Sequence, residues 1–445
     1  MGTINNFGNI LLPANSNTIN VQTLLTSVEE ANAIPMDLLE QQQNTLQTQS
    51  STLTSIEGDI SALATAVSAL SNTNGSINSL TATSSDSNLV TATADPTATP
   101  GTHTIVVNSL ATTASYYTDP VDPSTPLAAG SFQVAVGSNA PVTVTVDNTD
   151  NTLSGLAAAI NKQNVGVTAS VINDANGSRL ALVSNTSGST GNITISNNST
   201  GLNFHSAVSG ANASLTVDGV PISSASNTVS TVIPGVTLNL VGADSGVTVG
   251  LTLSPDANQA TSAINQFVSA WNKVIQDLNG QFDVSSNGTG GGPLEADNTL
   301  RSVQDQLLSS ITASVAGNNG FVNLATIGVN MNQDGTLSVD SGVLSNALSN
   351  DFSSVQNLLQ GAGGVATFLS TTLNQITDPT QGSISLDLQG MSQQNQDLTQ
   401  QISNMQTQLT TQDQLLVAEY TQMQNTLDEM PMLQSQITQQ LGSLG

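Results

Sequence analysis

An apolar residue recurs every seven positions at both ends of the chain. The N-terminal series runs Leu39, Leu46, Leu53, Ile60 and Val67, and the C-terminal series runs Ile402, Leu409, Leu416, Met423, Met430, Ile437 and Leu444. Seven residues make two turns of an α-helix, so each series lies along one helix face. Such a face either fills a core or binds a partner helix. For the C-terminal series we favour helix interaction, because it is long and lies at the end of the chain.

The helical pattern varies in strength along the two ends. Residues 1–37 are weakly patterned and predict a flexible or helical segment that Pro35 interrupts. The pattern strengthens from residue 38 and ends near residue 75. Residues 386–445 predict a C-terminal coiled-coil helix, which Pro431 should kink or break.

The middle of the chain, 76–255, changes to alternation of apolar and polar residues at period two. This pattern and its Gly, Asn and Asp punctuation are typical of half-buried strands. One helical stretch, from Leu153 to Ile160, interrupts it. A Pro-rich loop at 119–126 suggests two subdomains. We expect a β-rich head of one or two subdomains, with the inner one at about 115–205.

Helical spacing returns after residue 255, where Ser254 is the expected N-cap and Pro255 the expected first helical residue. Asp334-Gly335 lies between two short apolar runs and predicts a hairpin near 329–339. Residues 38–75 and 256–385 should form a helical leg domain. The predicted fold class is α+β: long terminal helices form a coiled-coil or helical-bundle stalk, and the β-rich head is inserted between them.

Composition excludes several classes of partner. Four Lys and Arg residues stand against 31 Asp and Glu, which gives a formal net charge of −27, and aromatic residues make up 3%. Phosphate backbones need clustered cations and bases need aromatic faces, so we expect no nucleic acid partner. No apolar run reaches eighteen residues, so we expect no membrane insertion. The start of the chain does not resemble a Sec-type signal peptide.

Cysteine is absent, which excludes a domain held together by disulfides. Protonation of all carboxylates would leave a charge of only about +6. The composition therefore predicts tolerance of acid, although a general compositional bias or a salty habitat would explain it equally well.

Few residues suggest site chemistry. His103 and His205 stand in strand-like segments without a ligand partner nearby in sequence, so we interpret them as structural. Asn330, Asn332 and Asp334 resemble part of a calcium loop, but the twelfth position is serine, which favours a plain turn. The helical stripe around the single tryptophan favours core packing. We expect no enzyme, and no catalytic, cofactor or metal site, because phosphate-loop, G-x-S-x-G and zinc patterns are all absent.

Four stretches resemble the bacterial flagellar filament cap family, also called hook-associated protein type two. They are PGTHTIVVNSLAT at 100–112, LAAAINKQNVGVTASVI at 156–172, ASLTVDGVPISSASNTVSTVIPGVTLNLVG at 213–242 and IGVNMNQDGTLSVDSGVLSNALSNDFSSVQNLL at 327–359. The second is similar to the flagellin-type repeat of these heads. The third is the most specific. With the terminal helices, the resemblance covers most of the chain.

The resemblance implies a secreted, extracellular assembly protein at the flagellum tip. Several copies would form a ring-like homo-oligomer and help exported flagellin fold and insert. Hook-associated junction proteins and an export chaperone are further implied partners. Two alternatives stay open: another flagellin-like junction protein of the filament, or a secreted adhesin that uses the β head for cell adhesion. Flagellin's Arg-rich terminal signatures are not seen here.

Overall fold

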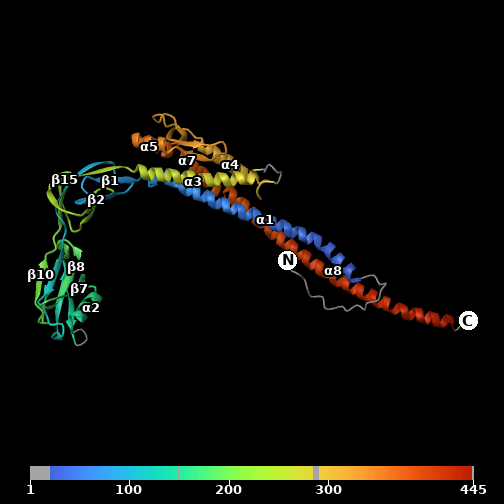
Figure 1. The fold of residues 1–445 in the computed structure, drawn as a ribbon, viewed down its shortest axis with the longest axis horizontal. Coiled ribbons are helices and arrows are strands. Elements are labelled where there is room, and N and C mark those ends of the chain that lie inside the picture. Colours follow the sequence, from blue (N-terminus) through green and yellow to red (C-terminus); the bar gives the residue numbers. More distant parts are fainter. Residues whose placement is uncertain (1–20, 148–150, 284–289, 443–445) are drawn as a thin grey trace.

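The structure is a computed structural model that describes residues 21–147, 151–283 and 290–442. It is elongated, with helices forming a leg and strands forming a head at one end (Figure 1). The combination of long terminal helices and a strand-rich middle confirms the predicted fold class. The described helices are α1 (Val21–Ser71), α2 (Leu153–Gln163), α3 (Ala257–Phe282), α4 (Asn298–Ile311), α5 (Ser341–Asn350), α6 (Phe352–Gln360), α7 (Val365–Thr377) and α8 (Ser383–Gly442).

The leg packs around one hydrophobic core to which α1, α3 to α7 and the start of α8 all contribute. α1 runs toward the head and α8 runs away from it, so the first turn of α1 and the last turn of α8 both point away from the head (Figure 1). α8 also continues beyond the start of α1 (Figure 1). The far part of α8 therefore has no neighbouring helix in the described part of the chain.

Both prolines lie inside continuous helices. α1 continues through Pro35 and α8 continues through Pro431. The expected interruption at Pro35 and the expected break at Pro431 are therefore wrong. A proline removes one hydrogen bond within the helix and leaves a carbonyl group without its donor. Both prolines are exposed, so water can bond that carbonyl while the turns on either side keep their own hydrogen bonds.

The part of the head nearer the leg contains two sheets around a second core. The five-stranded sheet has the order β1-β15-β3-β11-β12, and the three-stranded sheet has the order β13-β14-β2. Every pairing in them is antiparallel. The strands are β1 (Leu80–Ser84), β2 (Val90–Ala94), β3 (Gly101–Ser109), β11 (Ala213–Val217), β12 (Val220–Ser224), β13 (Thr228–Ile233), β14 (Val236–Leu240) and β15 (Asp244–Pro255).

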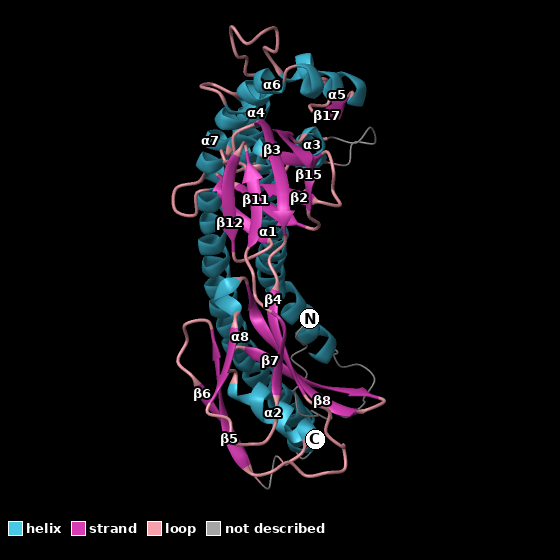
Figure 2. Cartoon of the chain, turned by 90° about the vertical axis from the view of Figure 1, so that its left-hand side faces the viewer, coloured by secondary structure: helices cyan, strands magenta, loops and turns pink. Residues whose placement is uncertain are grey.

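The outer part of the head has its own core and is inserted in sequence between β3 and β11. Its sheets have the orders β10-β4-β8-β7 and β6-β5-β9. Figure 2 shows this part of the head apart from the first, with α2 beside its strands. The strands are β4 (Thr113–Thr118), β5 (Gly130–Val136), β6 (Val142–Val146), β7 (Val167–Asp174), β8 (Gly177–Ser187), β9 (Ile193–Ser196) and β10 (Phe204–Val208).

The junction between head and leg lies where β15 ends and α3 begins. Asp256 is the N-cap of α3, and its carboxylate accepts hydrogen bonds from the backbone N–H groups of Asn258 and Gln259. The expected cap at Ser254 is wrong, because β15 continues through Pro255 and pairs with β1 there. An aspartate N-cap satisfies two backbone donors that have no partner within the helix.

The predicted hairpin is present as β16 (Val329–Met331) and β17 (Leu337–Val339). It packs against α3, where Trp271 is fully buried, as the sequence predicted. None of the described helices is both long and apolar enough to cross a membrane.

Candidate interaction surface

The N-terminal apolar series lies mostly inside the leg. Leu46 is buried, and Leu53, Ile60 and Val67 are at most 1% exposed, while Leu39 is half-buried. The last three of the series belong to the leg core, where α1 contacts α3, α7 and α8. The helix partner of this series is therefore the rest of the same chain.

The C-terminal series divides into two parts. Ile402, Leu409 and Leu416 are half-buried where α8 runs along α1. Beyond them exposure rises, to 58% at Met430 and 54% at Ile437. Leu444 lies outside the described residues. The half-buried part already has a partner helix, whereas the exposed part has none among the described residues.

The exposed part of α8 forms a continuous apolar face, which we call the distal stripe. Its residues follow steps of seven, three, four and four: Met423, Met430, Leu433, Ile437 and Leu441. Steps of three and four keep side chains on one face of a helix. The seven-residue spacing alone missed Leu433 and Leu441. Their i+3 and i+4 spacing from Met430 and Ile437 was the signal that could have found them.

The start of α1 adds two exposed apolar side chains, at Ile34 and Leu38. Gln and Thr dominate the polar surface of the α1–α8 pair, where Gln43 Nε2 donates to Thr399 Oγ1 at 2.8 Å. Uncharged polar groups form hydrogen bonds that are weak in water and do not fix one partner. The surface thus combines exposed apolar area with uncharged polar groups and acidic residues, among them Asp428 and Glu429 next to Met430.

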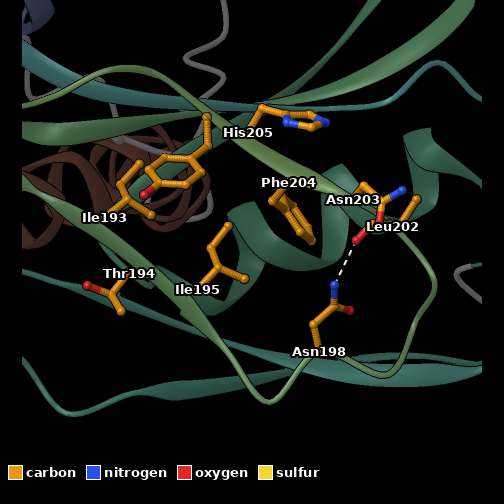
Figure 3. A pocket seen from close by; sticks show the side chains of 9 residues that line it. Ile193, Thr194, Ile195, Asn198, Leu202, Asn203, Phe204 and His205 are labelled. Carbon is orange, nitrogen blue, oxygen red and sulfur yellow. Dashed lines mark hydrogen bonds between the residues drawn. The ribbon is translucent and has the colours of Figure 1, made fainter.

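A recess of about 520 Å³ lies in the outer part of the head, between β9, β10 and the loop that joins them (Figure 3). Phe204 reaches into the core and packs against Phe132 in a tilted arrangement, with ring centroids 5.0 Å apart. The polar groups at the rim are already paired: Asn198 Nδ2 donates to the Leu202 carbonyl at 2.7 Å, and Asn203 Nδ2 donates to Asp119 at 3.0 Å. These bonds hold the loop against the strands.

Each histidine contacts an aspartate. His205 Nε2 lies 2.9 Å from Asp119 Oδ1, and His103 Nδ1 lies 2.7 Å from Asp218 Oδ2. Hydrogen bonds from Asn203 and then His205 lower the pKa of Asp119, and the bond with His103 does most to lower that of Asp218. These pairs could not be predicted from the sequence, since their members are at least 86 residues apart. They tie neighbouring strands or turns together.

The turn that resembles a calcium loop is bonded to itself. Asp334 Oδ1 accepts hydrogen bonds from the backbone N–H of Thr336 at 3.0 Å and from its hydroxyl at 2.6 Å. Asn332 Nδ2 donates to the same hydroxyl at 2.9 Å. Within residues 21–147, 151–283 and 290–442 no group of three or more potential metal ligands gathers.

Comparison with known proteins agrees with this architecture. The sequence profile described as the C-terminus of flagellar hook-associated protein 2 matches residues 210–431, and the profile for its N-terminus matches residues 17–114. The flagellin hook IN motif matches residues 131–186, in the outer head. The B-type flagellar hook-associated protein 2 of Pseudomonas aeruginosa is 32% identical, over 90% of this chain and 91% of that protein. The chain belongs to the flagellar hook-associated protein 2 family.

Other members of the hook-associated protein 2 family are similar over nearly the whole length. The flagellar hook-associated protein 2 of Escherichia coli K12 is 28% identical, over 95% of this chain and 96% of that protein. The crystal structure of the D1-D2-D3 domains of the flagellar cap protein FliD from Escherichia coli superimposes with a TM-score of 0.60 and 29% identity. The superposition covers 77% of this chain and 99% of the Escherichia coli chain.

Proposed function

We propose that this protein is the cap of a bacterial flagellar filament. Copies of it form a ring-like homo-oligomer at the extracellular tip and promote the insertion and folding of exported flagellin. The work is non-enzymatic and depends on shape and on helix contacts. The observation that carries this proposal, beside family membership, is the distal stripe: an apolar helix face that its own chain leaves exposed.

The distal stripe is suited to contacts that form and are released. Burying one large apolar side chain completely stabilises a contact by roughly 1.5–3 kcal/mol. A contact across part of the stripe therefore gains several kcal/mol, while no ion pair has to be broken to release it. The terminal helices of flagellin are the partners that we propose for it, together with hook-associated junction proteins where the filament begins.

Before secretion another protein would have to shield the same apolar face from water. We propose that an export chaperone binds the distal stripe inside the cell. Exposed apolar area of this kind otherwise promotes association between copies. The leg core and the two head cores contain none of the stripe residues. Changes in the stripe should therefore leave the fold intact.

The proposal is tested by replacing Met430, Ile437 and Leu441 together with glutamine in the full-length protein. The variant should fold with the circular dichroism and unfolding midpoint of the wild type, yet should not support filament growth in a strain that lacks its own copy. Phe368→Gln is the matched control, because Phe368 is an exposed apolar residue of the leg on α7. Normal filaments with the triple variant would show that the stripe is not the contact surface.

Removal of residues 421–445 is the second test. It spares Ile384, the residue of α8 in the leg core, and so keeps the leg folded. A deletion that begins at residue 386 would instead remove Leu388 and Met391, which pack against that core. The shorter protein should be soluble and should fail to cap.

A further inference from the structure

Two pairs of carboxyl groups join helices within the leg. In the first, Asp59 of α1 and Asp277 of α3 lie on either side of Lys273. In the second, Asp297 at the start of α4 lies beside Asp387 of α8, close enough for a hydrogen bond between the side chains. The two pairs differ in what neutralises them.

The first pair has a cation. Lys273 Nζ lies 3.2 Å from Asp59 Oδ2 and also contacts the carboxylate of Asp277. Lys273 reduces the repulsion between the two carboxylates but does not remove it, because burial and then the hydrogen bond with Asp59 still raise the pKa of Asp277. This arrangement uses one of only four Lys and Arg residues in the chain.

The second pair has no cation on it. Arg301 is one turn away on α4, but its guanidinium donates to the Glu295 carbonyl at 2.7 Å and lies over the ring of Phe282, 4.2 Å from its centroid. Asp297 is also the N-cap of α4, and its Oδ1 accepts from the Leu300 backbone N–H at 3.0 Å. It is therefore held in place beside Asp387.

The remaining charged groups around Asp387 are acidic. On α1, Glu57 Oε1 accepts from Ser385 Oγ at 3.5 Å, and in the loop before α4 the Glu295 carboxylate accepts from the Gly291 N–H at 2.7 Å. α7 contains no titratable residue. Asp387 Oδ2 is buried and has no hydrogen-bond partner. A buried carboxylate oxygen without a donor is unfavourable when ionised, and a neighbouring carboxylate makes it more so.

We propose that one proton shared by Asp387 and Asp297 clamps the start of α8 onto α4, so that the leg holds α8 more tightly in acid than at neutral pH. The proton turns a repelling pair into a donor and an acceptor. At neutral pH the proton has left, and the two carboxylates push the first turns of α8 away from α4.

The direction of the effect follows from the pKa of Asp387. Burial, followed by the charge of Asp297, raises this pKa from 3.8 to about 6. A carboxyl group whose pKa is higher in the folded state contributes stability that is fully present below about pH 4 and is lost as pH rises through about 6. Acid should therefore protect this contact, opposite to the usual effect of acid on paired carboxylates.

Hydrogen exchange of the full-length protein at pH 5 and pH 7.5 tests the clamp, after correction for the intrinsic exchange rate at each pH. Backbone amides of 383–391 should be protected about tenfold more at pH 5. That pH lies about one unit below the pKa of Asp387, and one unit corresponds to a factor of ten in the equilibrium. In Asp387→Asn the amide donates to Asp297 at both pH values. Protection of 383–391 should then be equal at pH 5 and pH 7.5.

Two more variants make the test specific. Asp297→Asn should also remove the pH dependence and should keep α4 capped, because asparagine is an equally good N-cap. Asp397→Asn, which changes an exposed acid on α8 bonded to Gln393, should behave as the wild type. Equal wild-type protection at both pH values, or a tenfold change that persists in Asp387→Asn, would overturn the clamp.

Discussion

Trp271 of α3 donates a hydrogen bond of 2.9 Å from its indole Nε1 to the carbonyl oxygen of Gly335, in the turn between β16 and β17. The next residue, Asn272, bonds both ways with Leu337: its side chain donates to the carbonyl at 2.8 Å and accepts from the N–H at 2.6 Å. Two consecutive residues of one helix therefore hold the whole hairpin in place. Loss of this contact should therefore destabilise the whole leg.

Replacement of Trp271 with phenylalanine should destabilise the protein by about 2–4 kcal/mol. The change leaves the Gly335 carbonyl without its buried donor and creates a cavity in the leg core. Urea unfolding should be followed by circular dichroism, because the variant lacks the only tryptophan. Phe368→Leu, at an exposed position on α7, should change stability by less than about 0.5 kcal/mol. A Trp271 variant as stable as that control would contradict the role given to this bond.

Alanine at Gly335 should also destabilise the leg. Gly335 has φ +81°, and an added Cβ would meet Leu308 Cδ2 at 2.9 Å. Gly219→Ala provides the comparison, because φ is +80° there and the space around it is open. It should cost about 1–2 kcal/mol from backbone strain alone. Thermal unfolding should show a larger loss for Gly335→Ala, and equal losses would mean that the side-chain contact is relieved without cost.

Gly280→Ala, in contrast, should increase the stability of the protein. Gly280 is exposed in the helix interior of α3, and nothing lies within 4 Å of an added Cβ. Alanine there should stabilise the protein by about 0.5–1 kcal/mol, because glycine loses more backbone entropy on folding. A lower unfolding temperature for this variant would show that α3 does not continue to Phe282 in solution.

The fold was predictable where the spacing of apolar residues agreed with the turn-forming residues between segments. The seven-residue spacing indicated both terminal helices, and alternation at period two indicated the strands around Phe132, Val134 and Val136, which are all buried. Helix limits were less predictable. Asp256 caps α3 in place of Ser254 because pairing between β1 and β15 extends the strand through Pro255, and such pairing is not visible in the local sequence.

The candidate site was predictable as a helix face but not in its burial. Ile60 and Ile437 occupy equivalent positions of their series, yet one is fully buried and the other is 54% exposed. The difference arises because α8 continues beyond α1, and no repeat within either segment encodes that offset. The contacts of His205 with Asp119 and of Asp387 with Asp297 depend on tertiary packing in the same way.

Asp351 should make stability fall in strong acid. Hydrogen bonds from the Ser354 side chain and backbone, then from Ser353 and Asn319, lower its pKa to about 2. A carboxylate with a lowered pKa contributes stability that is present above about pH 4 and is lost as pH falls through about 2. Unfolding temperatures measured from pH 4 to pH 2 should therefore decrease more for the wild type than for Asp351→Asn, whose side chain still caps α6. Asp305→Asn, at an exposed position on α4, should follow the wild type, and a parallel decrease in Asp351→Asn would exclude this source of acid sensitivity.

Two alanine substitutions separate the structural part of the apolar series from the exposed part. Ile60→Ala removes a side chain with no exposed area from the leg core and should cost about 2–5 kcal/mol in urea unfolding. Ile437→Ala removes an exposed side chain of the distal stripe and should change the free energy of unfolding by less than about 0.5 kcal/mol. The isolated protein therefore gains no stability from its distal stripe, and the residues there are free to contribute only to contacts with other proteins. A loss of several kcal/mol in Ile437→Ala would instead mean that the stripe is already buried in the free protein, for example between two copies. Sedimentation of the same variant would then show a change in oligomeric state.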